Sequence, residues 1–244
     1  MGPAFVDCHS HVLPSGDDGA QTLAEGHELC RLAAAAGTEL LFATPHVWPH
    51  LTLTDEREVA IRRAFAELVD EAPLELRLGF ELTPAAPLLE EDPAHYALEG
   101  TEIVLVEIPF AGPADGFGAL AEHVEASGLV PLVAHPERTE AVRERPELAH
   151  EAAARGWPLQ LNATSLLGRH GPEAEEIAWR LLEAGDAALV ASDGHRRDRP
   201  PRLDDAYERV RARIGEDAAR PLFDGSTLGL SPRPLPSRAG ARGA

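Results

Sequence analysis

Short apolar runs alternate along the chain with longer segments in which apolar residues recur every three or four positions. Seven runs are apolar at nearly every position, which is typical of strands that are covered on both faces of a parallel sheet. They span residues 4–8, 39–44, 75–80, 102–107, 130–134, 158–162 and 187–192. The alternation predicts an α/β fold, and we expect an approximately barrel-like closure rather than an open sheet.

Four of the intervening segments carry signals of helix ends. Thr54 is a favourable N-cap and is followed by acidic residues, and Pro172 stands near the first position of another helix. Gly37 and Gly185 are favourable C-terminal residues. The predicted helices lie within residues 22–37, 54–72, 171–185 and 202–215.

The composition describes an ordinary globular chain of 244 residues, with 44% hydrophobic and 26% charged residues. We expect one domain over residues 1–230 and a disordered tail over 231–244, which is rich in proline, glycine, serine and arginine. No apolar stretch approaches the roughly 20 residues of a membrane span, and the N-terminus does not resemble a signal peptide. Cys8 and Cys30 form no disulfide framework, so we expect a cytoplasmic location.

The net charge of −19 would repel a phosphate backbone, which argues against a nucleic-acid partner. All 22 basic residues are arginine, since the sequence contains no lysine. This absence excludes a metal centre that is bridged by a carboxylated lysine.

Polar residues that can bind metal follow six of the seven predicted strands. In a parallel α/β barrel such strand ends converge on one mouth. These residues are His9 and His11, His46, Glu81, Glu107, His135, and Asp193 with His195. His9 and His11 are two positions apart on a strand, so both face the same side. Together, the imidazoles and carboxylates predict more than one manganese, iron or zinc ion.

The remaining six of the eleven histidines fall in predicted helices or loops, and we interpret them as solvated or structural. They are His27, His50, His95, His123, His150 and His170. Cys8 lies between two candidate ligands but faces the opposite side of its strand, which favours a buried core position. Neither cysteine begins a Cys-x5-Arg motif, so thiol-based phosphatase chemistry is excluded.

Many amidohydrolases share the H-x-H beginning, and their glutamate-bridged members remain an alternative. However, six segments resemble, in order and spacing, those of the polymerase-and-histidinol-phosphatase (PHP) family. They are DCHSHVLPSGDDGA, ATPH, VEIPF, AHPER, SLLG, and SDGH followed by RPPRL. The similarity spans about residues 5–210. It is greatest to the branch of manganese-dependent bacterial protein-tyrosine phosphatases of capsule and exopolysaccharide loci.

This resemblance implies a distorted seven-stranded (β/α)7 barrel that holds three ions, with Mn²⁺ expected and iron or zinc as alternatives. It assigns His9, His11, Glu81 and Asp193 to one ion, Asp18, His46 and His195 to a second, and Glu81, Glu107 and His135 to a third. Asp17 competes with Asp18 for its role, and at least one of the two belongs to the turn SGDDG.

The implied reaction is hydrolysis of a phosphomonoester by water whose pKa the ions lower. Arg138 resembles the phosphate-binding arginine of the family, and a guanidinium matches phosphate geometry. Further arginines between Arg196 and Arg202 either recognise a phosphopeptide or are solvated. Family members commonly read HPERY and SDAHN, so Thr139 removes a possible aromatic wall of the substrate site.

The resemblance implies a tyrosine-phosphorylated protein as substrate, namely the tail of a bacterial tyrosine kinase that regulates polysaccharide export. A small-molecule phosphatase of the histidinol-phosphate type is the alternative enzyme. A metal-binding regulatory module without turnover is a third hypothesis, which the complete set of strand-end ligands disfavours.

Overall fold

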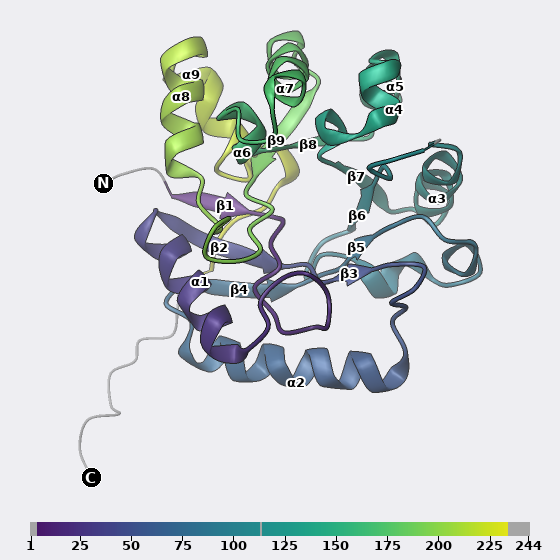
Figure 1. Cartoon of the computed structure of the whole chain (residues 1–244), viewed down its shortest axis with the longest axis vertical. Coiled ribbons are helices and arrows are strands. Elements are labelled where there is room, and N and C mark those ends of the chain that lie inside the picture. The colour runs from purple at the N-terminus through teal and green to yellow at the C-terminus, as the bar shows by residue number, and fades with distance from the viewer. Residues whose placement is uncertain (1–3, 113, 234–244) are drawn as a thin grey trace.

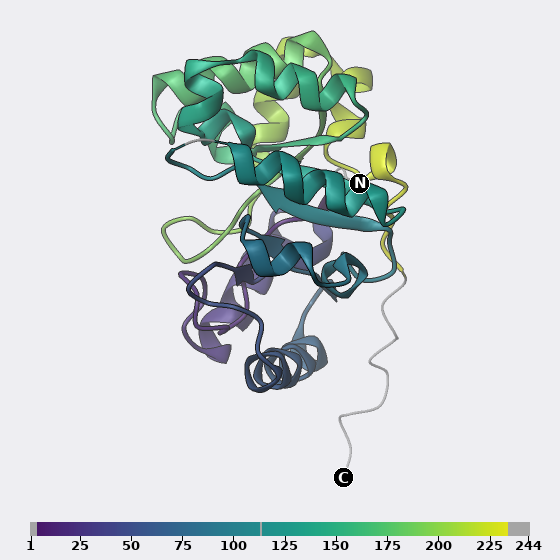
Figure 2. The same ribbon diagram turned by 90° about the vertical axis from the view of Figure 1, so that its right-hand side faces the viewer.

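The parallel strands occupy the middle of the protein, and the helices lie around them in both views (Figure 1 and Figure 2). The computed structural model describes residues 4–112 and 114–233. Its strands are β1 (Phe5–Asp7), β2 (Thr38–Ala43), β3 (His46–Val47), β4 (Glu75–Leu78), β5 (Glu81–Leu82), β6 (Ile103–Glu107), β7 (Val130–Ala134), β8 (Leu159–Asn162) and β9 (Ala187–Ala191). The sheet orders are β1-β2-β4 and β3-β5-β6-β7-β8-β9.

The longer helices cover the outer side of the strands (Figure 1). The α-helices are α1 (Leu23–Ala35), α2 (Asp55–Glu71), α3 (Asp115–Ala126), α4 (Glu140–Glu144), α5 (Glu147–Ala154), α6 (Ala163–Leu166), α7 (Pro172–Ala184), α8 (Asp204–Ile214) and α9 (Glu216–Ala219). The 3-10 helices are η1 (Ala86–Leu89), η2 (Pro93–Tyr96), η3 (Pro136–Arg138), η4 (Arg220–Leu222) and η5 (Ser226–Leu228).

The predicted count of seven strands is wrong, because two of the predicted strands are each interrupted and continue as a second short strand. Pro45 separates β2 from β3, and proline has no N–H group for the sheet. Gly79 separates β4 from β5 at a close approach, since a Cβ atom there would lie 2.5 Å from Leu98. The prediction of an α/β fold with parallel strands is confirmed.

An isolated parallel bridge between Ser10 and Gly194 links the residues that follow β1 to those that follow β9. The backbone N–H of Asp193 also donates to the His9 carbonyl at 3.0 Å. Closure of the strands into a barrel stays a prediction.

The predicted helix ends agree with the structure. The Thr54 hydroxyl accepts a hydrogen bond from the Arg57 N–H, and α7 begins at Pro172. Gly185 ends α7 with φ of 80°. The sequence did not predict α3, whose two glycines, Gly116 and Gly118, lower helix propensity.

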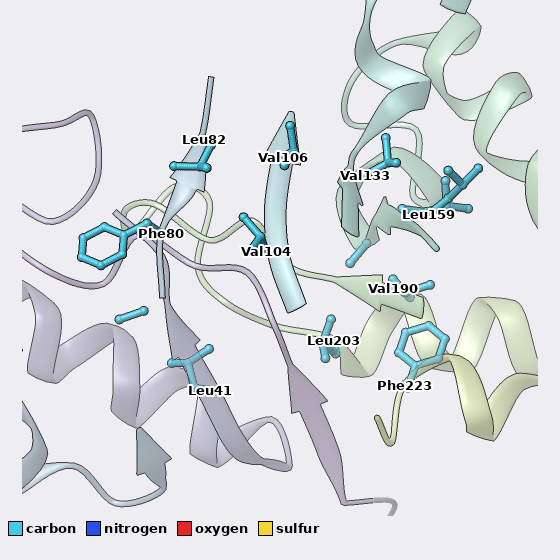
Figure 3. Close-up of a cluster of buried hydrophobic side chains, with 14 of the residues drawn as sticks. Leu41, Phe80, Leu82, Val104, Val106, Val133, Leu159, Val190, Leu203 and Phe223 are labelled. Carbon is cyan, nitrogen blue, oxygen red and sulfur yellow. The ribbon is translucent and has the colours of Figure 1, made fainter. Parts of the chain in front are cut away.

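Buried side chains pack between strands and helices, and Figure 3 shows part of this core, including Val104, Val133 and Phe223. A second apolar cluster contains Cys8, which directly follows β1, Phe42 from β2, and Leu230 from the C-terminal segment. Cys8 and Cys30 are both buried free thiols, which confirms the core position of Cys8.

Within the described ranges, no helix combines the length and the apolar character that crossing a membrane requires. The tail predicted to be disordered lies outside the described residues except for 231–233. In that short stretch the Ser231 carbonyl accepts a hydrogen bond from the Arg77 guanidinium at 2.9 Å.

Candidate metal centre

Four side chains that the family resemblance assigned to one ion meet at the carboxyl ends of the strands. His9 Nε2 lies 3.0 Å from Glu81 Oε2 and 3.1 Å from His11 Nε2. Asp193 Oδ1 lies 3.4 Å from both imidazole Nε2 atoms. Ligand atoms about 2.0–2.2 Å from one ion stand about 2.8–3.6 Å apart in tetrahedral or octahedral geometry. The donor atoms of His9, His11 and Asp193 therefore fit around a single divalent ion, and Glu81 Oε2 lies beside them, 3.2 Å from His11 Nε2.

A second group consists of the donor atoms of His11, Asp18, His46 and His195, which all lie within 4.8 Å of one another. Asp18 Oδ1 is 3.2 Å from His195 Nε2 and 3.7 Å from His46 Nε2. The structure thus brings together the three residues predicted for the second ion and adds His11 to them.

Asp17 and Asp18 have different surroundings. The Asp17 carboxylate is buried and accepts hydrogen bonds from the backbone N–H groups of His46 at 3.0 Å and Gly19 at 3.1 Å. The Asp18 side chain is 58% exposed and turns one oxygen toward two imidazoles. This geometry favours Asp18 as the ligand and Asp17 as a residue that holds the loop.

The predicted third set is only partly gathered. Glu81 Oε1 lies 2.9 Å from His135 Nε2, in a group that includes His9. Glu107 instead groups with Glu81 and His46. The sharing of one ion by Glu107 and His135 stays a prediction.

Several buried atoms of this cluster have no hydrogen bond, although buried polar atoms normally have one. They are His46 Nδ1, His135 Nδ1, Glu81 Oε2 and Glu107 Oε2. Burial and the Glu81 carboxylate raise the pKa of Glu107 well above its usual range. Burial alone would raise the pKa of Glu81, but the imidazoles of His46 and His9 hold it well below its usual range. Bound cations would satisfy the carboxylate oxygens and allow Glu107 to be ionised, so the donor set fits divalent transition metals.

The backbone is strained at two of the predicted ligands. Among the described residues, only His135 and Asp193 adopt positive φ angles without being glycine, at 31° and 49°. Such conformations cost about 1–3 kcal/mol each and concentrate at functional sites. The strain therefore supports a functional role for the cluster.

A chain of hydrogen bonds fixes the direction in which the His9 ring points. Asp193 Oδ2 can only accept, so the Asn162 amide N–H donates to it at 2.9 Å. The Gln160 amide N–H then donates to Asn162 Oδ1 at 2.9 Å, and His9 Nδ1–H donates to Gln160 Oε1 at 2.9 Å. His9 Nε2 is consequently left with its lone pair toward the donor cluster, as a metal ligand requires.

Two further imidazoles are oriented in the same way. His11 Nδ1 lies 3.4 Å from the Asp17 carboxylate, and His195 Nδ1–H donates to the Asp193 carbonyl at 2.9 Å. Each ring therefore presents Nε2 to the cluster. Gln160 and Asn162 were not among the residues predicted from the sequence, although two polar residues spaced two apart in the apolar run PLQLN were a usable signal.

Arg138 lies beside this cluster. Its Nη1 atom is 2.5 Å from Asp193 Oδ2, and its side chain is 15% exposed. Arg199 Nη1 lies 3.9 Å from the same oxygen. The other arginines of the 196–202 segment pair with acidic residues at the surface. Arg196 pairs with Glu25. Arg197 pairs with Glu28, and Arg202 with Asp204.

None of the six histidines interpreted as solvated or structural joins a group of metal-capable side chains in the described part of the chain. His170, for example, is hydrogen-bonded through Nε2 to the Thr164 hydroxyl at 2.6 Å.

Parallel strands with imidazole and carboxylate donors gathered at their carboxyl ends define an α/β protein with a candidate metal centre. The chain belongs to the capsular polysaccharide synthesis CpsB/CapC family, whose model matches residues 5–227.

The similarity to known relatives extends over most of both chains. The tyrosine-protein phosphatase YwqE of Bacillus subtilis is 30% identical over 199 residues, which are 78% of this chain and 77% of the relative. The tyrosine-protein phosphatase CpsB of Streptococcus agalactiae is 28% identical over 233 residues, which are 90% of this chain and 95% of the relative.

The fold also has a solved counterpart. It comes from a study of YwqE from Bacillus subtilis and CpsB from Streptococcus pneumoniae, which are described as metal-dependent tyrosine phosphatases. The TM-score is 0.75 at 28% identity, and the match covers 89% of this chain and 90% of that chain.

Proposed function

We propose that this chain is a metal-dependent phosphomonoester hydrolase that removes phosphate from phosphotyrosine in a partner protein. The proposed substrate is the tail of a bacterial tyrosine kinase that regulates capsular or exopolysaccharide synthesis. The relatives named as tyrosine-protein phosphatases support the activity. The observation that carries the proposal is the convergence of the donor atoms of His9, His11, Glu81 and Asp193 within 3.4 Å of their neighbours.

The proposal includes three ions, with Mn²⁺ as the expected metal, held by the three sets of residues that the family resemblance implies. It also includes a barrel that closes between β1 and β9, which the bridge between Ser10 and Gly194 supports. The two free cysteines are compatible with a reducing cytoplasm as the place where the protein acts.

Bound metal ions would supply Lewis acidity and lower the pKa of water to provide the nucleophile. The chain's own contribution is to hold and orient the phosphate. The guanidinium groups of Arg138 and Arg199 lie on the Asp193 side of the cluster, where they can donate to phosphate oxygens. Arg138 is kept in place by the Asp193 carboxylate, so the ligand and the phosphate-binding group are positioned together.

The test is a kinetic comparison of the purified protein with Mn²⁺ on a phosphotyrosine peptide and on histidinol phosphate. We expect a higher kcat/KM for the peptide. A higher kcat/KM for histidinol phosphate, or no phosphate release from either substrate, would contradict the proposal.

A further inference from the structure

A cavity of about 390 Å³ lies next to the candidate metal centre. Its lining includes Phe110, Arg138, Arg143 and His170, together with the first residues of α7. Arg138 connects the two sites, because it lines the cavity and also contacts Asp193 of the metal centre. The volume falls within the range of about 300–1,000 Å³ that is common for small-ligand sites.

Phe110 is an exposed aromatic residue that is nevertheless held firmly in place. It follows β6 by three residues, and 43% of its surface is exposed. Its ring stacks on the His135 ring with centroids 5.2 Å apart and an interplanar angle of 10°. The Arg138 guanidinium carbon lies 4.6 Å from the centre of the Phe110 ring. These contacts hold the Phe110 ring at the border between the candidate metal centre and the cavity.

Thr139 cannot provide an aromatic wall and is occupied elsewhere. It is fully buried, and its hydroxyl caps α4 by accepting from the Val142 N–H at 3.3 Å. The same hydroxyl donates to the Pro136 carbonyl at 3.0 Å. Of the residues that line this cavity, Phe110 is the aromatic one next to Arg138.

We infer that Phe110 forms the wall that contacts the aromatic ring of the substrate, so that this site selects aryl over alkyl phosphomonoesters. This inference rests on the proposed function and specifies its substrate class. A phosphate held by Arg138 would place its ester oxygen, and an aryl ring attached to that oxygen, on the Phe110 side of the centre. Because His135 and Arg138 already pack against the Phe110 ring, the substrate ring would meet its exposed edge, an arrangement that aromatic pairs favour.

The experiment measures binding, so that it does not depend on turnover. Dissociation constants for phenylphosphonate and methylphosphonate are measured by calorimetry on the metal-loaded wild type, Phe110→Ala, Phe110→Tyr and Leu89→Ala. Leu89 serves as the control because it is a similarly exposed apolar residue, at 37%, on η1. We expect the wild type to bind phenylphosphonate about tenfold more tightly than methylphosphonate.

In Phe110→Ala, the dissociation constants for the two phosphonates should differ by no more than about threefold. Phe110→Tyr and Leu89→Ala should keep the wild-type preference for phenylphosphonate. If Phe110 acted only by positioning Arg138, the alanine variant would weaken both phosphonates equally and the ratio would stay unchanged. That result, or a wild type without preference for the phenyl compound, would overturn the inference.

Phosphate release from phosphotyrosine and phosphoserine peptides by the same variants separates the inference from the proposed function. A wild type that shows the phenyl preference but hydrolyses neither peptide would contradict the proposed function and support the role of Phe110. An active wild type whose preference for the phosphotyrosine peptide survives Phe110→Ala would overturn the inference alone.

Discussion

Replacing Gln160 by methionine should weaken metal binding, although Gln160 is not itself a predicted ligand. The side chain is fully buried and joins His9 Nδ1 to Asn162 Oδ1 through two hydrogen bonds of 2.9 Å. Methionine is of similar size but leaves both of these atoms without a partner, at a cost of about 1–3 kcal/mol each. We therefore expect the free energy of unfolding to fall by about 2–6 kcal/mol. Release of the His9 ring should lower metal affinity by about 10–100-fold, as is typical for residues that orient a ligand.

The assay is competition for Mn²⁺ with a chromophoric chelator, combined with thermal unfolding. Leu161→Ala is the matched control, because Leu161 is the next residue of β8, is fully buried and faces the opposite side. It should lose about 2–5 kcal/mol of stability while its metal affinity stays unchanged. Gln160→Glu still accepts from His9, so its affinity should fall less than that of the methionine variant. Equal metal affinity in Gln160→Met, Leu161→Ala and the wild type would refute the reasoning.

Three further predictions concern the mouth of the site. Arg138→Ala should lower kcat on a phosphotyrosine peptide by roughly 10²-fold, while elemental analysis shows unchanged metal content. Arg138→Lys should restore only part of the lost kcat. A near-normal kcat/KM in the alanine variant would remove Arg138 from the mechanism. Alanine at both Asp193 and His195 should abolish hydrolysis and reduce bound metal while circular dichroism stays native, and unchanged turnover with unchanged metal would place the site elsewhere. Gly194→Ala should also reduce metal content and activity, because its Cβ would lie 2.5 Å from the Pro201 backbone and displace the loop that carries His195. Gly118→Ala, where a Cβ meets nothing within 4 Å, should leave both unchanged, and identical behaviour of the two glycine variants would contradict this reading.

The sequence predicted the strands well because their apolar runs are continuous and their ends carry conspicuous residues. It failed on the strand count because the break at Gly79 depends on a tertiary contact and the local signal of Pro45 was not used. A Cβ at Gly79 would collide with Leu98, which is distant enough in sequence that no local pattern reveals the contact.

The candidate ligands could be read from strand ends, since the carboxyl ends of parallel strands converge. The residues that orient them were harder to find. Gln160 reaches His9 across 151 positions of sequence, and only the paired sheet brings the two together. Likewise, the choice between Asp17 and Asp18 depends on which carboxylate the loop turns toward the imidazoles, and two adjacent aspartates look alike in the sequence.

Phe110 illustrates a different limit. It stood within a motif that the sequence analysis used, VEIPF, but its contacts with His135 and Arg138 depend on how the segments after β6 and β7 fold against each other. In the sequence, Thr139 suggested that an aromatic wall was missing. The structure instead places Phe110, which follows another strand, beside Arg138.

The most direct test of the account is to titrate metal-free protein with Mn²⁺ while bound metal and phosphate release from a phosphotyrosine peptide are measured on the same samples. The account predicts that activity is absent in excess chelator, rises with occupancy and reaches its maximum above one metal equivalent per chain. Full activity of the metal-free protein in excess chelator would contradict it.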